Sequence, residues 1–229
     1  MKTIGLIGGI SWLSTLDYYR LLNEMVNEKL GGSEAAKIII YSVNFGEIKI
    51  LTEADRWDKL SVIICDAAKK LEIAGADCVL IGANTMHKIA PAVRESVSIP
   101  LIHVAEEAAK EINKNDFKTV ALLGTKYTMQ LPFFKDILSN YGIKTIIPGI
   151  DEIEMINKAI YDEMGKGIFL PGTKQKFLNI IKKLAGEGAE GIILGCTEIP
   201  ILIKQQDCDV PVFDTTRIHA KAAVEFALQ

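Results

Sequence analysis

The amino-acid sequence predicts an α/β fold of two pseudo-symmetric domains with largely parallel sheets and a ligand site between them. The first observation behind this prediction is that short apolar segments alternate with longer segments in which apolar residues recur every three or four positions. Such alternation of strand and helix is typical of parallel sheets covered by helices. The second observation is that three segments of the first half recur, in the same order, in the second half.

Each predicted strand is a short apolar run that ends at a glycine, a proline or a polar turn residue. In chain order these runs cover residues 3–7, 37–43, 78–82, 100–103, 118–123, 143–147, 191–194 and 210–213. Each predicted helix has apolar residues spaced three and four apart, so that they share one face. The helices cover residues 14–30, 56–74, 104–114, 150–164 and 174–186.

The two halves of the chain match each other at three places. The matching pairs are IGLIGG (4–9) with VALLGT (120–125), AGADCVLIGANT (74–85) with EGAEGIILGCTE (187–198), and IPLIHVAEEAAKEI (99–112) with VPVFDTTRIHAKAA (210–223). Each match is loose, but three matches in one order at nearly constant spacing indicate a duplicated half-molecule of domain size.

The duplication suggests where a ligand would bind. In open α/β sheets, ligands bind beyond the carboxyl ends of the strands, where backbone N–H groups of the next helix are available. If the two halves face each other about a pseudo-twofold axis, the strand ends at residues 83 and 196 approach one substrate from opposite sides.

Composition excludes several classes of function. The chain has 229 residues and a formal net charge of −3, which gives no electrostatic basis for binding nucleic acid or an anionic membrane. No apolar run is long enough to span a bilayer, and we interpret the N-terminal MKTIGLIGGISW as a first strand rather than a signal peptide. The four cysteines lack CxxC spacing, which favours a reduced, cytoplasmic setting over a disulfide framework.

Cys196 is the strongest candidate for a catalytic residue. It follows an apolar strand and precedes a predicted helix N-terminus, where the helix dipole and free amides would lower the pKa of a thiol. Thr197 and Glu198 add a hydroxyl and a carboxylate at the same strand end. The alternative is a small apolar residue at a strand end, but the repeat favours a functional role. We interpret the other cysteines as structural: Cys65, Cys78 and Cys208.

The segment GANTMHK places polar residues at the end of the matching strand in the first half. Asn84 and Thr85 could cap the following helix or bind a carboxylate, and Thr125 has the same two interpretations. His87 lies about one helical turn after Asn84, so it could face the same site or the solvent. No metal site is predicted, because the three histidines lack ligand spacing with one another or with the cysteines.

Two further segments contribute candidates. In GLIGGISW, Gly8 and Gly9 permit a tight turn and close approach of a ligand, while Ser11 is a candidate helix cap. These glycines do not follow G-x-G-x-x-G, so the signal for dinucleotide binding is weak. Lys166 lies in a glycine-flanked loop and becomes a candidate only if the substrate is acidic.

The pattern resembles the aspartate/glutamate racemase family nearly end to end. GGISWLSTLDYY (8–19) is similar to the opening motif of that family, NTMH (84–87) to its first active-site turn, and GCTE (195–198) to its second. The resemblance implies a cofactor-independent enzyme, often a dimer, with its site between two similar α/β halves. Two cysteines act on opposite faces of the amino acid, one removing the α-proton and the other donating a proton.

The resemblance also assigns roles to residues of this chain. Cys196 would be one acid/base, and Lys166 would help bind the distal carboxylate of aspartate or glutamate. The α-carboxylate would be held by Asn84, Thr85, Thr125 and Thr197. The substrate-binding set is completed by Ser11, Gly9, Thr52, His87 and Glu198. Because the final helix of the family packs back on the first half, we predict domains of residues 1–98 plus 210–229 and of residues 99–209.

Two departures from the family pattern bear on activity and substrate. Ala83 stands at the position of the first cysteine and cannot transfer a proton. There is also no arginine near Ile48, where some aspartate racemases have one, and Thr52 stands where broader-specificity members often have a larger polar residue. Substrate preference therefore stays open between aspartate, glutamate and another amino acid.

Three explanations of Ala83 stay open. The chain is an aspartate/glutamate racemase with a cysteine-to-alanine substitution, or a one-thiol enzyme like the related decarboxylases of malonate-type acids, or a non-catalytic protein that binds an acidic amino acid. The first is favoured because every other element of the motif set is intact. All three predict a small acidic ligand, no metal and no nucleic-acid or membrane partner, and the resemblance implies a homodimer.

Overall fold

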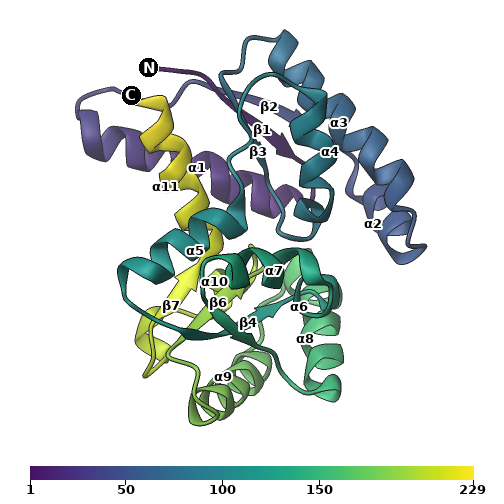
Figure 1. Cartoon of the computed structure of the whole chain (residues 1–229), viewed down its shortest axis with the longest axis vertical. Helices are drawn as coiled ribbons and strands as arrows, with labels where there is room; N and C mark the ends of the chain where they lie inside the picture. The colour runs from purple at the N-terminus through teal and green to yellow at the C-terminus, as the bar shows by residue number, and fades with distance from the viewer. The chain divides into compact units, whose positions relative to one another are not determined.

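The computed structural model describes residues 1–229, and the chain forms two compact units (Figure 1). Unit 1 contains Met1–His103 and His219–Gln229, and unit 2 contains Val104–Ile218. Each unit has its own sheet, and every strand pair in both sheets is parallel. The predicted fold class of two α/β domains with parallel sheets is therefore confirmed.

The sheet of unit 1 has three strands in the order β2-β1-β3. These strands are β1 (Ile4–Gly8), β2 (Ile38–Ser42) and β3 (Cys78–Ile81). The central strand β1 pairs Ile4 with Ile38 on one side and with Cys78 on the other. The strands predicted at 3–7, 37–43 and 78–82 are confirmed to within one residue at each end.

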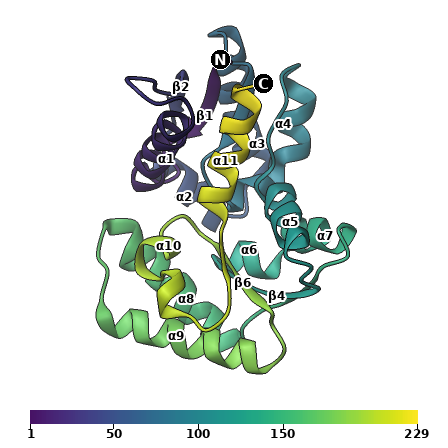
Figure 2. The same ribbon diagram turned by 90° about the vertical axis from the view of Figure 1, so that its left-hand side faces the viewer.

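Side chains of β1 alternate between the two faces of this sheet, because successive residues of a strand point to opposite sides. Ile4 and Leu6 pack against α1 (Trp12–Leu30) and the last turns of α11 (Thr215–Ala227). Ile7 instead packs against α3 (Trp57–Ile73) on the opposite face. Figure 2 shows α1 and α11 together in front of β1, with α3 behind.

Two helices of unit 1 were not predicted from the sequence, α2 (Phe45–Glu53) and α4 (Ala90–Ser96). Both are short and bury only two residues each, so their apolar pattern is too brief to indicate a helix. A 3-10 turn, η1 (Thr85–Ile89), connects β3 to α4.

The predicted strand at 100–103 forms a single parallel bridge rather than a full strand. Val79 of β3 pairs with Leu101, and the N–H of Ile102 donates to the carbonyl of Val79 at 3.1 Å. This pairing attaches residues 100–102 to the sheet of unit 1. The predicted boundary at 98/99 places these residues in the second half instead.

The sheet of unit 2 has four strands in the order β5-β4-β6-β7. They are β4 (Thr119–Gly124), β5 (Lys144–Ile146), β6 (Gly191–Gly195) and β7 (Val212–Asp214). The helices and 3-10 turns of this unit are α5 (Val104–Lys114), α6 (Lys126–Gln130), α7 (Pro132–Asn140), α8 (Ile150–Asp162), η2 (Met164–Lys166), α9 (Pro171–Gly186), α10 (Ile199–Leu202) and η3 (Gln205–Asp207). One continuous apolar core fills the unit.

Strand order supports the duplication inferred from sequence. β1, β2 and β3 of unit 1 have the same order and direction as β4, β5 and β6 of unit 2. The bridge at Leu101 stands beside β3 as β7 stands beside β6. The repeated segments therefore occupy equivalent places in the two sheets.

Both boundaries between the two observed units lie later in the chain than the predicted boundaries at 98/99 and 209/210. The first change falls after His103, because residues 100–102 pair with β3. The second falls after Ile218, because β7 pairs with β6 and so belongs to unit 2. None of the helices combines the length and apolar character needed to cross a membrane.

Candidate active site

In unit 1, the carboxyl ends of β1 and β3 lie side by side, since Ile7 pairs with Ile81. The turns that follow these two strands therefore emerge at the same edge of the sheet. The N–H of Gly82 donates to the carbonyl of Ile7 at 2.9 Å, and the hydroxyl of Ser14 donates to the carbonyl of Gly82 at 2.7 Å. Helix α1 thus holds the turn after β3 through a buried hydrogen bond.

Gly9 and Ser11 shape the turn after β1. Gly9 has φ of +82°, and a Cβ there would lie 2.1 Å from the carbonyl oxygen of Val43. Its N–H donates to the hydroxyl of Thr15 at 2.8 Å. Ser11 caps α1, its Oγ accepting from the N–H of Ser14 at 3.4 Å. The close approach that requires glycine here is made by the protein's own backbone.

The turn after β3 carries Ala83, Asn84 and Thr85, all of which are buried. Asn84 makes no side-chain capping hydrogen bond to η1, so the capping interpretation of this residue is wrong. The interpretation of Asn84 and Thr85 as ligands of a carboxylate stays a prediction.

His87 is buried, with only 1% of its surface exposed, so the solvent-facing alternative is wrong. Its Nδ1 lies 2.9 Å from the carbonyl oxygen of Ala83. Its ring packs edge-on against His103, with the ring centroids 4.6 Å apart.

Thr52, the other candidate in unit 1, lies on the buried face of α2. Its hydroxyl donates to the carbonyl of Ile48 one turn earlier, at 2.7 Å. Ile48 is also buried. Ile48 and Thr52 therefore share the buried face of α2, and neither carries a charge.

In unit 2, the carboxyl ends of β4 and β6 are adjacent, since Gly124 pairs with Gly195. A Cβ on Gly124 would lie 2.7 Å from the carbonyl oxygen of Gly195, so the close strand approach requires glycine. Thr125 and Cys196, the next residues on each strand, therefore emerge at the same sheet edge. Thr125 caps α6, accepting from the N–H of Thr128 at 3.3 Å.

Cys196 is buried and hydrogen-bonded to a carboxylate. Its Sγ donates to Oε2 of Glu198 at 3.0 Å, and the hydroxyl of Thr197 donates to the same oxygen at 2.8 Å. Glu198 and Thr197 are buried as well. The GCTE motif thus folds into a compact group in which one carboxylate accepts from both a thiol and a hydroxyl.

The environment raises the pKa of Cys196 well above its ordinary value. Burial is the main cause, followed by the charge of Glu198 and its hydrogen bond to the thiol. The amides of Glu198 and Thr197 act in the opposite direction but are outweighed. The predicted lowering of the Cys196 pKa by a helix N-terminus is therefore wrong, and helix α10 is only four residues long. At neutral pH the sulfur keeps its proton.

Lys166 is an exposed residue at the end of the turn η2, whose first residue, Met164, is buried. Its backbone N–H donates to the carbonyl of Glu163 at 2.9 Å, and Gly167, with φ of +77°, ends the turn. No hydrogen bond or ion pair joins its ammonium group to Cys196 or Glu198. Its assignment to a distal carboxylate stays a prediction.

The remaining cysteines are free and form no disulfide. Cys78 is buried in β3, where burial raises the pKa of its thiol to about 12. Cys65 lies on α3 with its Sγ 3.8 Å from the hydroxyl of Ser61. These environments agree with the structural interpretation of Cys65 and Cys78.

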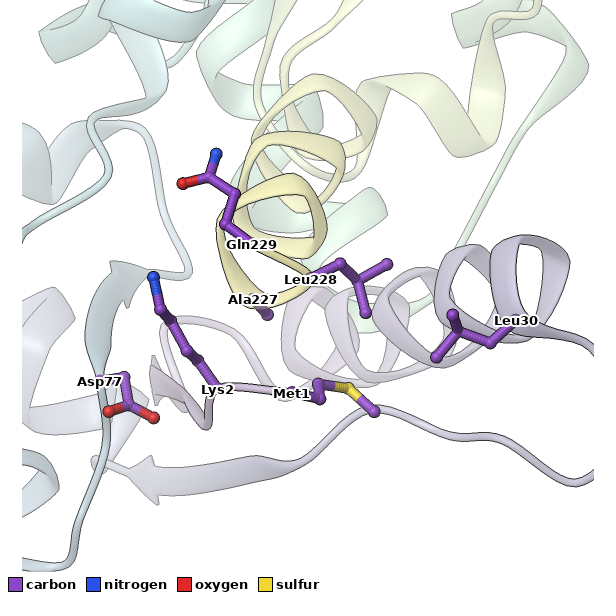
Figure 3. Close-up of a pocket in the computed structure, with 7 residues that line it drawn as sticks. All are labelled: Met1, Lys2, Leu30, Asp77, Ala227, Leu228 and Gln229. Atoms are coloured by element: carbon purple, nitrogen blue, oxygen red, sulfur yellow. The ribbon is translucent and has the colours of Figure 1, made fainter.

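Unit 1 also has an open pocket, shown in Figure 3. Its lining consists of residues from the chain ends, α1 and the loop before β3: Met1, Lys2, Leu30, Asp77, Ala227, Leu228 and Gln229. Lys2 and Asp77 precede β1 and β3, so the pocket lies at the amino edge of the sheet. The candidate residues follow the carboxyl ends of the same strands, so this pocket is separate from them.

Sequence reasoning missed residues that support the two turns from elsewhere in the chain. Ser14 holds the Gly82 carbonyl, and Asn157 of α8 accepts from the N–H of Lys126 at 3.0 Å. His103 and His219 pack against His87. These contacts join residues far apart in sequence, so no local spacing could have indicated them.

A duplicated parallel α/β fold with a buried cysteine–carboxylate pair at a strand end is typical of an enzyme rather than of a structural protein. The chain matches the model of the Asp/Glu/hydantoin racemase family over residues 7–223 and belongs to that family. The resemblance inferred from the sequence motifs is confirmed.

Individual relatives agree with the family assignment. The broad specificity amino-acid racemase RacX of Bacillus subtilis is 25% identical over 167 residues, which cover 73% of this chain and 72% of that protein. A Yersinia pestis protein described as a candidate Asp/Glu racemase is 43% identical, with a TM-score of 0.93 and 100% of both chains covered. An aspartate racemase homologue from Pyrococcus horikoshii is 38% identical, with a TM-score of 0.87 and 100% of both chains covered. Family membership supports an isomerase activity, that of an amino-acid racemase.

Proposed function

We propose that this chain acts on the α-carbon of an acidic amino acid, aspartate or glutamate, with Cys196 as its acid/base group. The observation that carries the proposal is the buried pair of Cys196 and Glu198, with Sγ and Oε2 3.0 Å apart. The names of the relatives, an amino-acid racemase and an aspartate racemase homologue among them, support the substrate class.

The chemistry needs a base at the α-carbon and a place for the proton. An α-proton is weakly acidic, so the base must be held close to it and the developing negative charge must be stabilised. In our proposal the carboxylate of Glu198 takes the thiol proton of Cys196, and the freed thiolate then takes the α-proton. The reverse transfer returns a proton to the same face of the α-carbon.

The carboxylates of the substrate would be bound by groups at the strand ends. We assign the α-carboxylate to the amides and hydroxyls of Asn84, Thr85, Thr125 and Thr197. Lys166 would bind the distal carboxylate. A carboxylate held by several N–H and O–H donors also accepts part of the charge that develops when the α-proton leaves.

Inversion requires a second proton donor on the opposite face, and Ala83 cannot supply one. We therefore expect this chain to exchange the α-hydrogen of one enantiomer with solvent and to invert it very slowly. The test is proton NMR of both enantiomers of aspartate and of glutamate in deuterated buffer. Loss of the α-proton signal of a single enantiomer is the expected result, and Cys196→Ala is expected to abolish it.

Replacing Ala83 with cysteine tests the racemase assignment directly. If the proposal is correct, Ala83→Cys converts exchange at one face into racemisation, detected by circular dichroism of the amino acid. Ala83→Ser is the matched control, since its hydroxyl is a far weaker acid than a thiol. If Ala83→Cys is inert on both amino acids, the racemase proposal is wrong.

Two alternatives predict different results for the parent chain. A one-thiol decarboxylase would release carbon dioxide from a malonate-type acid. A binding protein for an acidic amino acid would show a thermal shift with ligand and no exchange of the α-hydrogen. The hydrogen-bonded Cys196–Glu198 pair favours proton transfer over binding alone.

We also propose a homodimer in a reducing, cytoplasmic setting. The four free cysteines support the reducing compartment, because secreted proteins of this kind would be exposed to oxidation. Light scattering after size exclusion would test the dimer, and a monomer at micromolar concentration would contradict it.

A further inference from the structure

All three histidines of the chain gather in the core of unit 1. His87 lies on η1, His103 lies just before α5, and His219 lies on α11. The ring of His87 is 4.6 Å from that of His103 and 5.5 Å from that of His219, measured between centroids. All three are buried. We refer to these residues as the three-histidine cluster.

Hydrogen bonds fix how the ring of His219 is oriented. Its Nε2 lies 2.8 Å from the carbonyl oxygen of Ile102, which can only accept, so Nε2 carries a hydrogen. Nδ1 lies 2.8 Å from the hydroxyl of Tyr18. In the neutral ring Nδ1 is the acceptor, and Tyr18 donates to it.

Hydrogen bonds to the backbone also orient the rings of His87 and His103. The Nδ1 of His87 donates to the carbonyl of Ala83 at 2.9 Å, because a carbonyl only accepts. His103 is hydrogen-bonded to the backbone of His87. Burial lowers the pKa of His103 to about 3 and that of His219 to about 4, and it also lowers the pKa of His87 well below its ordinary value. At neutral pH the rings are uncharged and each has a fixed hydrogen-bonding role.

We propose that His87 is a positioning residue for the turn Gly82–Thr85 and not a ligand of the substrate. Its Nδ1 is already used by the Ala83 carbonyl, and its ring is enclosed by the other two histidines. The inference deepens the proposed function and rests on it for the identity of the substrate. It concerns the backbone of the turn, which can be tested without a substrate.

The physical argument follows from the planarity of the peptide group. In a trans peptide the C=O and the next N–H point in opposite directions. His87 holds the Ala83 carbonyl, and Ser14 holds the Gly82 carbonyl at 2.7 Å. These two bonds therefore fix the directions of the Asn84 and Ala83 N–H groups. Directed N–H groups at a strand end are the donors that a carboxylate needs.

The cluster explains why His87 can perform this role. An isolated buried imidazole can turn about χ2 and exchange its hydrogen-bonding nitrogens. Here, packing against His103 and His219 holds the ring, and the bonds from Tyr18 and to Ile102 hold His219. Helices α1 and α11, which lie near opposite ends of the sequence, thereby both support the turn after β3.

The test compares His87→Asn with His87→Leu. Asparagine places an amide N–H near the position of Nδ1, whereas leucine fills similar space without a donor. We expect backbone amides of residues 83–86 to exchange with deuterium roughly three- to tenfold faster in His87→Leu, the range for loss of one buried hydrogen bond. His87→Asn should stay within about twofold of the parent, given the same retained bond.

Substrate kinetics provide the second measurement. For exchange of the substrate α-hydrogen, His87→Leu should raise KM more than it lowers kcat, since the misdirected amides bind the carboxylate in both ground and transition states. His87→Asn should restore KM. If the parent chain shows no α-hydrogen exchange at all, the proposed function fails, and amide exchange still decides the role of His87.

Ser14→Ala is the second variant, in case His87→Leu does not fold. It removes the donor to the Gly82 carbonyl from a different helix and should speed amide exchange in the same segment. Equal amide exchange in the parent, His87→Leu and Ser14→Ala would overturn the proposal. So would a His87→Leu protein that loses substrate binding with the turn's amide exchange unchanged, because that result identifies a direct ligand.

Discussion

At the scale of single residues, the most informative contact is the bond between Cys196 and Glu198. The sequence placed a thiol and a carboxylate two positions apart, which made a shared site predictable. It did not predict that burial and the carboxylate together raise the thiol pKa. Burial and the negative charge of Glu198 disfavour a thiolate, so the sulfur of Cys196 is protonated at rest. It must lose this proton before it can act as a base.

Glu198→Gln should lower the pKa of Cys196 while leaving it above the ordinary value. The substitution removes the negative charge, the second cause of the shift, and leaves burial, the first cause, in place. The thiolate fraction at alkaline pH should therefore rise, measured by ultraviolet absorbance as the difference from a matching Cys196→Ala protein.

The same substitution should reduce α-hydrogen exchange by about a hundredfold, since the thiol loses the acceptor for its proton. Glu187→Gln, at an exposed carboxylate, is the control and should change neither quantity. An unchanged exchange rate in Glu198→Gln would show that the thiol proton leaves by another route.

At the scale of elements, local patterns predicted the sheet strands and most of the longer helices, although α11 was not among the helices they indicated. The helix predicted at 104–114 has the same bounds as α5, and the strand predicted at 191–194 is β6 with one residue added. Short elements were missed because they bury few residues, as α4 does. The long-range contacts of the site were not predictable, because Ser14 and Gly82 meet only after β1 and β3 pair.

The turn between β1 and α1 allows a controlled test of a backbone constraint. Gly9 and Gly31 both have positive φ, +82° and +76°, but only at Gly9 would a Cβ collide with neighbouring atoms. Gly31→Ala should cost about 1–3 kcal/mol, because φ of +76° with ψ of −173° is a backbone conformation that L-residues rarely adopt. Gly9→Ala should cost more than about 3 kcal/mol, because the Val43 backbone must also move.

Urea denaturation followed by tryptophan fluorescence measures this difference, since Trp12 and Trp57, the two tryptophans of the chain, lie in unit 1. Equal midpoints for Gly9→Ala and Gly31→Ala would contradict the steric argument. The comparison is matched because both residues flank α1 and differ mainly in the space around the added methyl group.

At the scale of the whole molecule, the two units share one strand order but differ in their polar cores. Unit 1 contains the three-histidine cluster, whereas unit 2 contains no histidine and carries the Cys196–Glu198 pair. The duplication was predictable from repeated segments of sequence. The clustering of the histidines was not predictable from the sequence, because His219 lies in unit 1 only as a consequence of how α11 packs there.

The cluster predicts that acid destabilises unit 1. Each ring stays neutral in the folded unit, while the unfolded chain binds a proton near the ordinary pKa of 6.5. Between that value and the lowered folded pKa, the unfolded state binds more protons, so the free energy of unfolding falls as pH falls. Each histidine contributes up to about 1.4 kcal/mol per pH unit. The effect is present below pH 6.5 and absent above it.

Urea midpoints from tryptophan fluorescence between pH 7.5 and about pH 5.5 test this prediction, because carboxylates with an ordinary pKa of 4.5 stay mostly charged over that window. His219→Gln keeps a donor for the Ile102 carbonyl and removes one titrating ring, so the pH slope should become shallower by about a third. Arg94 is the charged group that acts on His103, and Arg94→Gln should leave the slope nearly unchanged because burial dominates that pKa. A fluorescence midpoint that does not vary with pH would show that the rings take up protons without opening unit 1.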